Sequence, residues 1–275
     1  MKAQTKISIS EFFNFHHHPF SDTYVVKSVF LTQRDQRIKR QSVNLISQGK
    51  SLALTGPSGS GKSTLIRHII NGLDPNNYRI CHIHYGGLKR SGILRAIADA
   101  LGIDAAGRNL PLLVKIQKHI FALDAQTKPL YPVFVIDDAQ LMETEALMDL
   151  CSLTVSPAKR TIAASVVLVG DDILAKKLNL HVMTPIRTRM TAVFSQQVLS
   201  EDESMDFISF RLKNAGADEN LFDRDALSLI CAHCRGNRRQ IMNMATLLID
   251  EAFYRQENII SANLIYESDL FDIAE

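Results

Sequence analysis

The residues with the clearest capacity for chemistry form a glycine-rich run between an apolar segment and a helical pattern. Positions 56–63 read Gly-Pro-Ser-Gly-Ser-Gly-Lys-Ser and fill every fixed position of the pattern G-x-x-x-x-G-K-[ST]. In such a loop backbone N–H groups surround phosphates, the lysine reaches the β- and γ-phosphates, and the serine hydroxyl ligates Mg²⁺. The sequence therefore predicts a site for ATP and Mg²⁺ formed by Gly56, Pro57, Ser58, Gly59, Ser60, Gly61, Lys62, Ser63 and Thr64.

Two carboxylates, Asp137 and Asp138, follow the wholly apolar run at 133–136. A short apolar run predicts a strand that is buried on both faces. We expect this strand to lie beside the strand that leads into the phosphate loop. Asp137 would then hold Mg²⁺, usually through water, and Asp138 would align the attacking water as a general base. The alternative is a helix N-cap or a buried salt bridge.

The elements that must position these residues alternate between strand and helix. This alternation predicts βαβ units and a parallel sheet, followed by a small region that is helical throughout. Ser200 and Glu203 fit a capping box at the start of that region. We expect strands at 51–56, 78–85, 133–137, 164–170 and 191–199, helices between them at 62–73, 91–102 and 144–153, and final helices at 201–214, 224–234, 238–255 and 262–269.

Composition narrows the choice of partners. The 275 residues are 46% hydrophobic and 22% charged, with a formal net charge of +2, so any nucleic-acid surface must be local. The start lacks the apolar core of a signal peptide and no run is long enough to span a bilayer, which predicts a cytoplasmic protein without a membrane contact. Cys231 and Cys234 form a lone C-x-x-C, interpreted as two thiols on one helical face. The histidine run 16–18 is interpreted as a solvated loop, with metal binding as the alternative.

Residues 51–255 resemble AAA+ ATPases of the ExeA-like (general secretion ATPase A) group, which includes the TniB-like ATP-binding helper proteins of bacterial transposons. The matching stretches are EFFNFHHHPF at 11–20, the phosphate loop, VIDDAQL at 135–141, VLVGDDIL at 167–174, IRTRM at 186–190 and GNRRQIMN at 236–243. The resemblance implies an α/β fold: a lead-in segment at 1–45, a three-layer P-loop (AAA+) parallel sheet domain at 46–199, and a small all-helical lid at 200–275.

The resemblance also implies roles for residues outside the phosphate loop. Phe20, in an FF-x-x-x-x-x-PF segment, would pack near the adenine or act as a hydrophobic staple. Asp171, after the fourth strand, would sense the γ-phosphate. Arg187 or Arg189 would be an arginine finger offered to a neighbouring subunit, unless both are surface cations. Arg239, in G-x-x-R, would reach the nucleotide as a second sensor.

Two positions depart from the group's pattern. Asp138 stands where the group has glutamate, and Asp171 stands where an amide is usual. Aspartate is one methylene shorter than glutamate, so the attacking water must come closer or a second water must bridge. Extra carboxylates near a γ-phosphate disfavour anion accumulation unless Mg²⁺ or arginine offsets them. Both departures predict slow ATP hydrolysis.

A stand-alone unit of this length resembles a transposition helper, which assembles on DNA with ATP and recruits a transposase. Two pairs of cations, Lys89-Arg90 and Lys159-Arg160, fall in loops that would line the channel of a ring or filament of identical subunits. Such loops bind duplex DNA without sequence preference. The alternatives are a secretion or envelope-assembly ATPase that acts on protein partners, and a module that binds nucleotide without hydrolysis.

Overall fold

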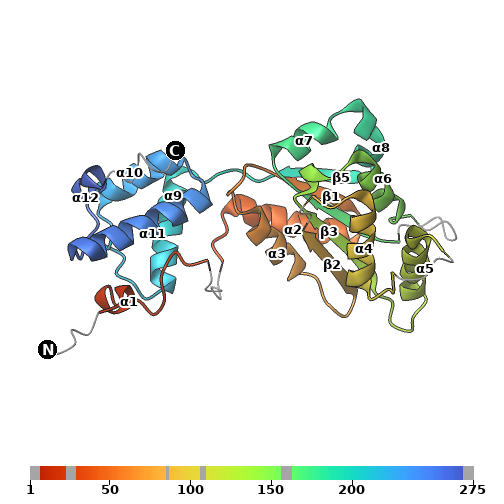
Figure 1. Ribbon diagram of the computed structural model, residues 1–275, viewed down its shortest axis with the longest axis horizontal. Helices are drawn as coiled ribbons and strands as arrows, with labels where there is room; N and C mark the ends of the chain where they lie inside the picture. Colours follow the sequence, from red (N-terminus) through yellow and green to blue (C-terminus); the bar gives the residue numbers. More distant parts are fainter. Residues whose placement is uncertain (1–6, 23–28, 85–86, 106–109, 156–162, 269–275) are drawn as a thin grey trace. The chain divides into compact units, whose positions relative to one another are not determined.

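The chain divides into two compact units in the computed structural model, which describes residues 7–22, 29–84, 87–105, 110–155 and 163–268. An α/β unit comprises Gln33–Ser58 and Lys62–Gln196. A helical unit comprises Met1–Thr32, Gly59–Gly61 and Gln197–Glu275 (Figure 1). The tip of the phosphate loop therefore clusters with the helical unit, while both of its ends belong to the α/β unit.

The α/β unit is built on one five-stranded parallel sheet, as the alternating pattern predicted. The strand order is β2-β3-β4-β1-β5. β1 and β4 are buried over their whole length, in agreement with their apolar runs LAL and VVLV. The strands are β1 (Ser51–Thr55), β2 (Tyr78–His84), β3 (Tyr131–Asp137), β4 (Ser165–Val169) and β5 (Met190–Ser195).

One expectation about the sheet is wrong: the strand with the acidic pair does not lie beside the strand of the phosphate loop. β4 lies between β3 and β1 and pairs with both in parallel. A central place needs a strand that is apolar on both faces, and SVVLV meets that need. Ile136 pairs with Leu168, and Leu54 pairs with Val169, so the three strands end at the same edge of the sheet.

Helices cover both faces of this sheet. Side chains that alternate along the strands, such as Phe134 and Leu168, join one apolar cluster with residues of α4 to α8. On the other face, α2 packs against α3 and β1, and α3 contacts β4. The helices are α2 (Gln33–Ser47), α3 (Lys62–Ile70), α4 (Arg90–Leu101), α5 (Leu112–Asp124), α6 (Thr144–Ser152), α7 (Asp172–Leu178) and α8 (Thr184–Arg187), with short 3₁₀ turns at Ala139–Leu141 and His181–Met183.

Helix α2 was not expected from the sequence, which suggested only a lead-in segment there. Its inward side chains are Asp35, Ile38, Ser42 and Ile46, so half of its buried positions are polar. The rest of the helix is strongly polar, so its apolar stripe is short, and packing against α3 and β1 supplies much of its stability.

The helical unit matches the predicted helices closely. It contains α1 (Ile9–Phe12), α9 (Glu201–Asn214), α10 (Arg224–Cys234), α11 (Arg238–Arg255) and α12 (Ala262–Glu267). The capping box at Ser200 and Glu203 is formed, with Glu203 N donating to Ser200 Oγ at 3.2 Å. Cys231 and Cys234 are buried free thiols on α10, and burial raises their pKa values to about 11 and about 12.

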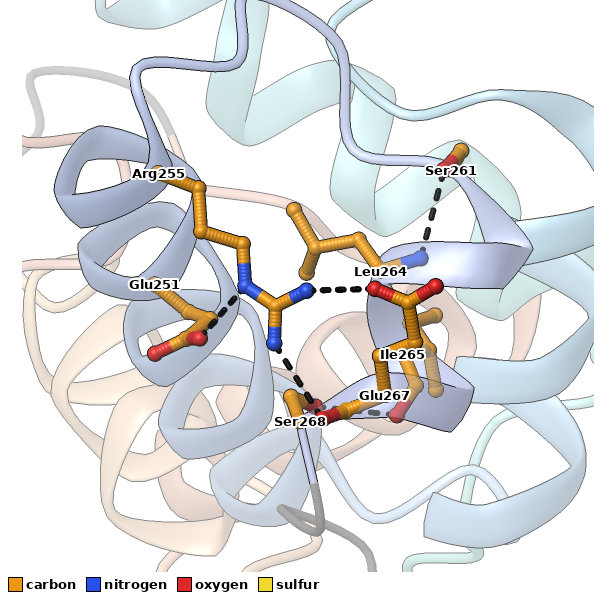
Figure 2. A network of polar contacts seen from close by, with 7 residues as sticks. All are labelled: Glu251, Arg255, Ser261, Leu264, Ile265, Glu267 and Ser268. Carbon is orange, nitrogen blue, oxygen red and sulfur yellow. Dashed lines mark hydrogen bonds and ion pairs between the residues drawn. The ribbon is translucent and has the colours of Figure 1, made fainter.

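Arg255 ties the end of α11 to α12. Its Nε donates to Glu251 Oε1 at 2.7 Å, and its Nη1 donates to Glu267 Oε2 at 2.7 Å (Figure 2). Ser261 begins α12 as predicted, accepting a hydrogen bond from Leu264 N at 3.3 Å. This network fixes the last helix of the unit against the longest one. Among the described residues, no helix combines the length and apolar character needed to cross a bilayer.

Candidate nucleotide site

The phosphate loop begins at a glycine that no other residue could replace. Gly56 has φ 150°, and a Cβ atom at this position would lie 2.2 Å from the carbonyl oxygen of Gln196. Gln196 N in turn donates to Thr55 O at 2.7 Å, which extends the pairing of β1 with β5 by one residue. The backbone of the neighbouring strand therefore holds the entry to the loop.

Lys62, the first residue of α3, keeps its ammonium group at the start of this loop. Its Nζ donates to Gly56 O at 2.7 Å and to Pro57 O at 2.8 Å. Burial lowers the pKa of Lys62, while carboxylates, with Asp137 as the strongest, oppose that shift. The loop thus contains a partly desolvated cation, which interacts with an anion more strongly than a solvated one does.

Ser63 and Asp137 come together at the carboxyl edge of the sheet. Ser63 Oγ donates to Asp137 Oδ2 at 3.1 Å, and Asp137 is 9% exposed. A hydroxyl and a carboxylate are hard oxygen ligands of the kind that Mg²⁺ prefers. Of the residues that the structure describes, no three His, Cys, Asp or Glu side chains form a metal-binding group. The pair fits Mg²⁺, which takes few protein ligands and completes its shell with phosphates and water.

Asp138 is held through both of its carboxylate oxygens. Gln140 Nε2 donates to its Oδ1 at 3.1 Å, and His84 Nε2 lies 3.4 Å from its Oδ2. The backbone of Asp138 is left-handed, with φ 56° and ψ 36°. Neither His84 nor Gln140 was predicted as a site residue from the sequence. The signal for His84 was its place as the last polar residue of β2, which the sheet register pairs with Asp137.

Asp171 caps a helix. Its Oδ1 accepts hydrogen bonds from Ile173 N at 2.8 Å and from Leu174 N at 3.4 Å, at the start of α7. It is also among the carboxylates that raise the pKa of Lys62, so it lies near the loop cation. Sensing of the γ-phosphate by Asp171 stays a prediction.

Both candidate finger arginines are exposed; Arg187 ends α8 and Arg189 follows it. Arg187 donates to the side-chain oxygen of Asn179. Arg189 contacts the thiol of Cys151. Burial raises the pKa of this thiol, and the charge and hydrogen bond of Arg189 oppose that shift. A role for either one at a neighbouring subunit stays a prediction.

The helical unit touches the loop tip through Arg238, the neighbour of the arginine that the sequence indicated. Arg238 is 8% exposed, and its guanidinium donates to Ser60 O. The side chain of Arg239 is exposed, while its backbone N–H donates to Asn237 Oδ1 at 3.1 Å and to Gly59 O at 3.3 Å. The G-x-x-R spacing identified Arg239 and passed over Arg238, whose burial is a tertiary property.

Phe20 is 3% exposed in the core of the helical unit, edge-on to Phe222 with ring centroids 6.2 Å apart. This is the arrangement of the staple alternative, and contact with adenine stays a prediction.

Two of the four residues predicted to contact DNA lie within the described part of the chain. Lys89 is exposed and precedes α4. Arg90 is the first residue of α4 and so does not lie in a loop as expected. Its Nε and Nη2 form a two-pronged pair with Asp149, at 2.6 Å and 2.8 Å. Lys159 and Arg160 lie outside the described residues.

Comparison with known proteins supports the fold. Residues 44–178 match the family model described as AAA domain. The ORC2 protein of Aeropyrum pernix, solved as ADPNP-ADP complexes, superposes with a TM-score of 0.71 at 14% identity, covering 91% of this chain and 70% of that one. The fold is that of AAA+ P-loop ATPases. The structure of the Aeropyrum pernix ORC1 protein in complex with DNA gives a TM-score of 0.67 at 15% identity, covering 91% of this chain and 67% of that one.

One relative by sequence is General secretion pathway protein A of Aeromonas hydrophila. It is 27% identical over 250 residues, which are 90% of this chain and 45% of that protein. The chain thus spans a little under half of the relative's length. This similarity agrees with the ExeA-like part of the resemblance and covers the AAA+ fold as a whole.

Proposed function

We propose that this protein is a Mg²⁺-dependent ATPase that hydrolyses ATP slowly and assembles with ATP on duplex DNA. The observation that carries the ATPase proposal is the meeting of Lys62, Ser63, Asp137 and Asp138 at one edge of the sheet. Ser63 Oγ and Asp137 Oδ2 are 3.1 Å apart, although β4 separates the strand before the phosphate loop from the strand that ends at Asp137.

The side chains divide the work. Mg²⁺, held through Ser63 and Asp137, would neutralise charge on the phosphate oxygens. Lys62 places an ammonium against the β- and γ-phosphates, and the loop N–H groups surround them. Asp138 accepts a proton from the attacking water. Because His84 and Gln140 already lie against its two oxygens, Asp138 must give up one of these contacts to align the water, which supports slow hydrolysis.

The proposal of DNA binding is supported by an exposed positive charge and by similarity to a solved structure. Lys89 is an exposed cation directly after the sheet edge that carries the acidic pair. The structurally similar ORC1 protein was solved in complex with DNA. Assembly would align such cations from several subunits, and a transposase or related protein would be the recruited partner.

A second candidate has its own support. The relative General secretion pathway protein A favours an ATPase that acts on protein partners in secretion or envelope assembly. That relative is more than twice as long as the matched region, so its whole activity does not transfer to this chain.

Phosphate release and DNA binding separate these proposals. With ATP and Mg²⁺, the rate per subunit is expected to rise with protein concentration, since the finger acts across subunits. Arg189→Ala flattens that rise, or Arg187→Ala does if that arginine is the finger. Anisotropy of a labelled duplex is expected to rise only with ATP and to fall steeply with salt. Phosphate release without any DNA binding at low salt would favour the protein-directed candidate, and no phosphate release would leave a nucleotide-binding module.

A further inference from the structure

Helix α2 presents a strongly polar outward face. Its buried side chains all lie on one side. In the α/β unit, α2 packs against α3 and β1 (Figure 1). Over residues 33–41 the outward side is exposed and consists of arginines and glutamines: Gln33, Arg34, Gln36, Arg37, Arg40 and Gln41. Most of these side chains line an open depression of about 550 Å³.

The arginines of this face form a row. Arg34, Arg37 and Arg40 follow one another every three residues, a rise of about 4.5 Å per step along the helix. We call this row with its glutamines the α2 arginine face. In the part of the chain that the structure describes, none of the three arginines has a carboxylate within ion-pair distance.

No acidic side chain on α2 offsets this charge. Asp35 is the one acidic residue of the helix, and it is 2% exposed on the opposite side. It accepts a hydrogen bond from Gln196 Nε2 at 3.3 Å, within the buried interior. The outward charge is therefore positive along the N-terminal half of the helix.

We infer that the α2 arginine face is a contact surface for the phosphate backbone of duplex DNA, separate from the cations around Lys89. The inference rests on the proposed DNA partner and adds a place where the duplex lies. Guanidinium groups match phosphate geometry with two parallel hydrogen bonds, and glutamine amides donate to phosphate oxygens as well. A row of permanent cations along a straight helix fits a polymer with regularly spaced negative charges.

The composition of the face argues against a membrane as the occupant. Helices that lie in a lipid interface bury large apolar side chains beside their cations. No exposed large hydrophobic side chain lies on α2, among the residues described. An acidic surface of a second copy of this chain is the remaining competitor, and the experiment includes it as an outcome.

The test removes charge from the face and measures duplex binding. In Arg37→Gln with Arg40→Gln, both changes are to a good helix former at exposed positions, so folding is retained. With a slow ATP analogue present, the anisotropy titration of a labelled duplex is expected to show at least a tenfold loss of affinity at low salt. The slope of log affinity against log salt is expected to fall by about 2, roughly 0.9 for each phosphate that the variant no longer neutralises. Nucleotide affinity stays unchanged.

A matched control removes the same charge elsewhere in the α/β unit. Lys118→Gln with Lys128→Gln changes two exposed cations away from α2 and is expected to leave the affinity and salt slope near those of the unmodified protein. Arg37→Lys with Arg40→Lys keeps the charge without the planar donor pair and is expected to give intermediate affinity.

Each contrary result has a distinct meaning. If the unmodified protein binds the duplex and the α2 variant binds it equally well, the face is not the contact surface, while the proposed DNA partner stands. If the control loses as much affinity as the α2 variant, bulk charge explains the effect and the inference fails. A variant that keeps DNA binding but loses self-association in sedimentation assigns the face to a second copy. If the unmodified protein binds no duplex at low salt, the DNA part of the proposed function fails as well.

Discussion

His84 Nε2 lies 3.4 Å from Asp138 Oδ2, at the ends of two neighbouring parallel strands. The side chain of His84 is 71% exposed and that of Asp138 is 39% exposed, so the pair sits at a surface that solvent reaches. The candidate base is therefore engaged before any water is aligned beside it.

His84→Ala is expected to raise the rate of ATP hydrolysis by a few-fold without changing nucleotide affinity. The variant removes the imidazole that lies against Asp138 Oδ2 and so leaves this oxygen open to the attacking water. Steady-state phosphate release and a nucleotide titration measure the two quantities. His82→Ala, on the same strand, is the control and is expected to have little effect. A large fall in rate would instead make His84 a residue that positions the base.

Asp138→Asn is expected to bind ATP normally and to lose turnover by roughly 100-fold or more, since the amide cannot accept the proton of water. Single-turnover phosphate release checks this. Asp171→Asn is the comparison: its side chain still caps α7, so activity is expected to persist. Full activity in the Asp138 variant would move the base elsewhere, with Asp171 as the first candidate.

Lys62→Ala is expected to weaken ATP binding by roughly 100-fold, because hydrogen bonds to charged groups are worth about 1.5–3 kcal/mol each and the loop loses its cation. Isothermal titration with ATP and Mg²⁺ measures the affinity. Lys176→Ala, at an exposed position on α7, is the control. Equal affinity in the Lys62 variant would mean that the phosphate site is misassigned.

Arg238→Ala is expected to lower the free energy of unfolding by about 1–3 kcal/mol, since it leaves the Ser60 carbonyl without a charged donor and empties a buried position. Arg239→Ala, at an exposed side chain, is expected to change it by less than about 0.5 kcal/mol. Its effect is expected instead on the nucleotide-dependent movement of the lid. Chemical denaturation without nucleotide gives the ranking, and the reverse order would contradict these assignments.

The helical unit is expected to lose stability as pH falls below about 6.5. Burial lowers the pKa of His18 in the folded protein, with Arg211 and His17 adding to the shift and Asp250 opposing it. The unfolded chain therefore takes up the proton first, and stability present above pH 6.5 declines towards the lower folded pKa. Protonation also removes the acceptor, His18 Nδ1, of the hydrogen bond from Phe20 N.

Melting curves at pH 7.5 and 5.5 test this loss. His18→Asn is expected to show a smaller decrease in melting temperature between the two values than the unmodified protein. His119→Asn, in the α/β unit, is the control and is expected to leave the decrease unchanged. An identical decrease in the His18 variant would assign the pH dependence to other groups.

The strands and most helices were predictable because short stretches of sequence show which residues are buried and where helices begin. Strands buried on both faces read as apolar runs, and capping residues such as Ser200 and Ser261 mark helix starts. Strand order was not predictable, since no local pattern says that β4 separates β1 from β3. Helices α1, α2, α5, α7 and α8 were not expected, and α2 lies in a segment whose residues are mostly polar.

The candidate site shows the same division. The phosphate loop follows from a pattern with fixed spacing, and Asp137 follows from its place after an apolar run. The structure brings Ser63 to Asp137. His84 is an ordinary polar residue in sequence, and only the pairing of β2 with β3 brings it to Asp138. Likewise, the pairing of Arg90 with Asp149 spans 59 positions, which no local pattern indicates.

The left-handed backbone of Asp138 bears on which carboxylate this position accepts. Aspartate and asparagine are enriched in that region of backbone space, whereas a longer side chain there costs of the order of 1 kcal/mol. Asp138→Glu would extend the reach of the base towards water and would also strain the turn that presents it. We therefore expect Asp138→Glu to hydrolyse ATP faster and to unfold at a lower temperature. At this one position, selection for a faster rate would work against selection for thermal stability.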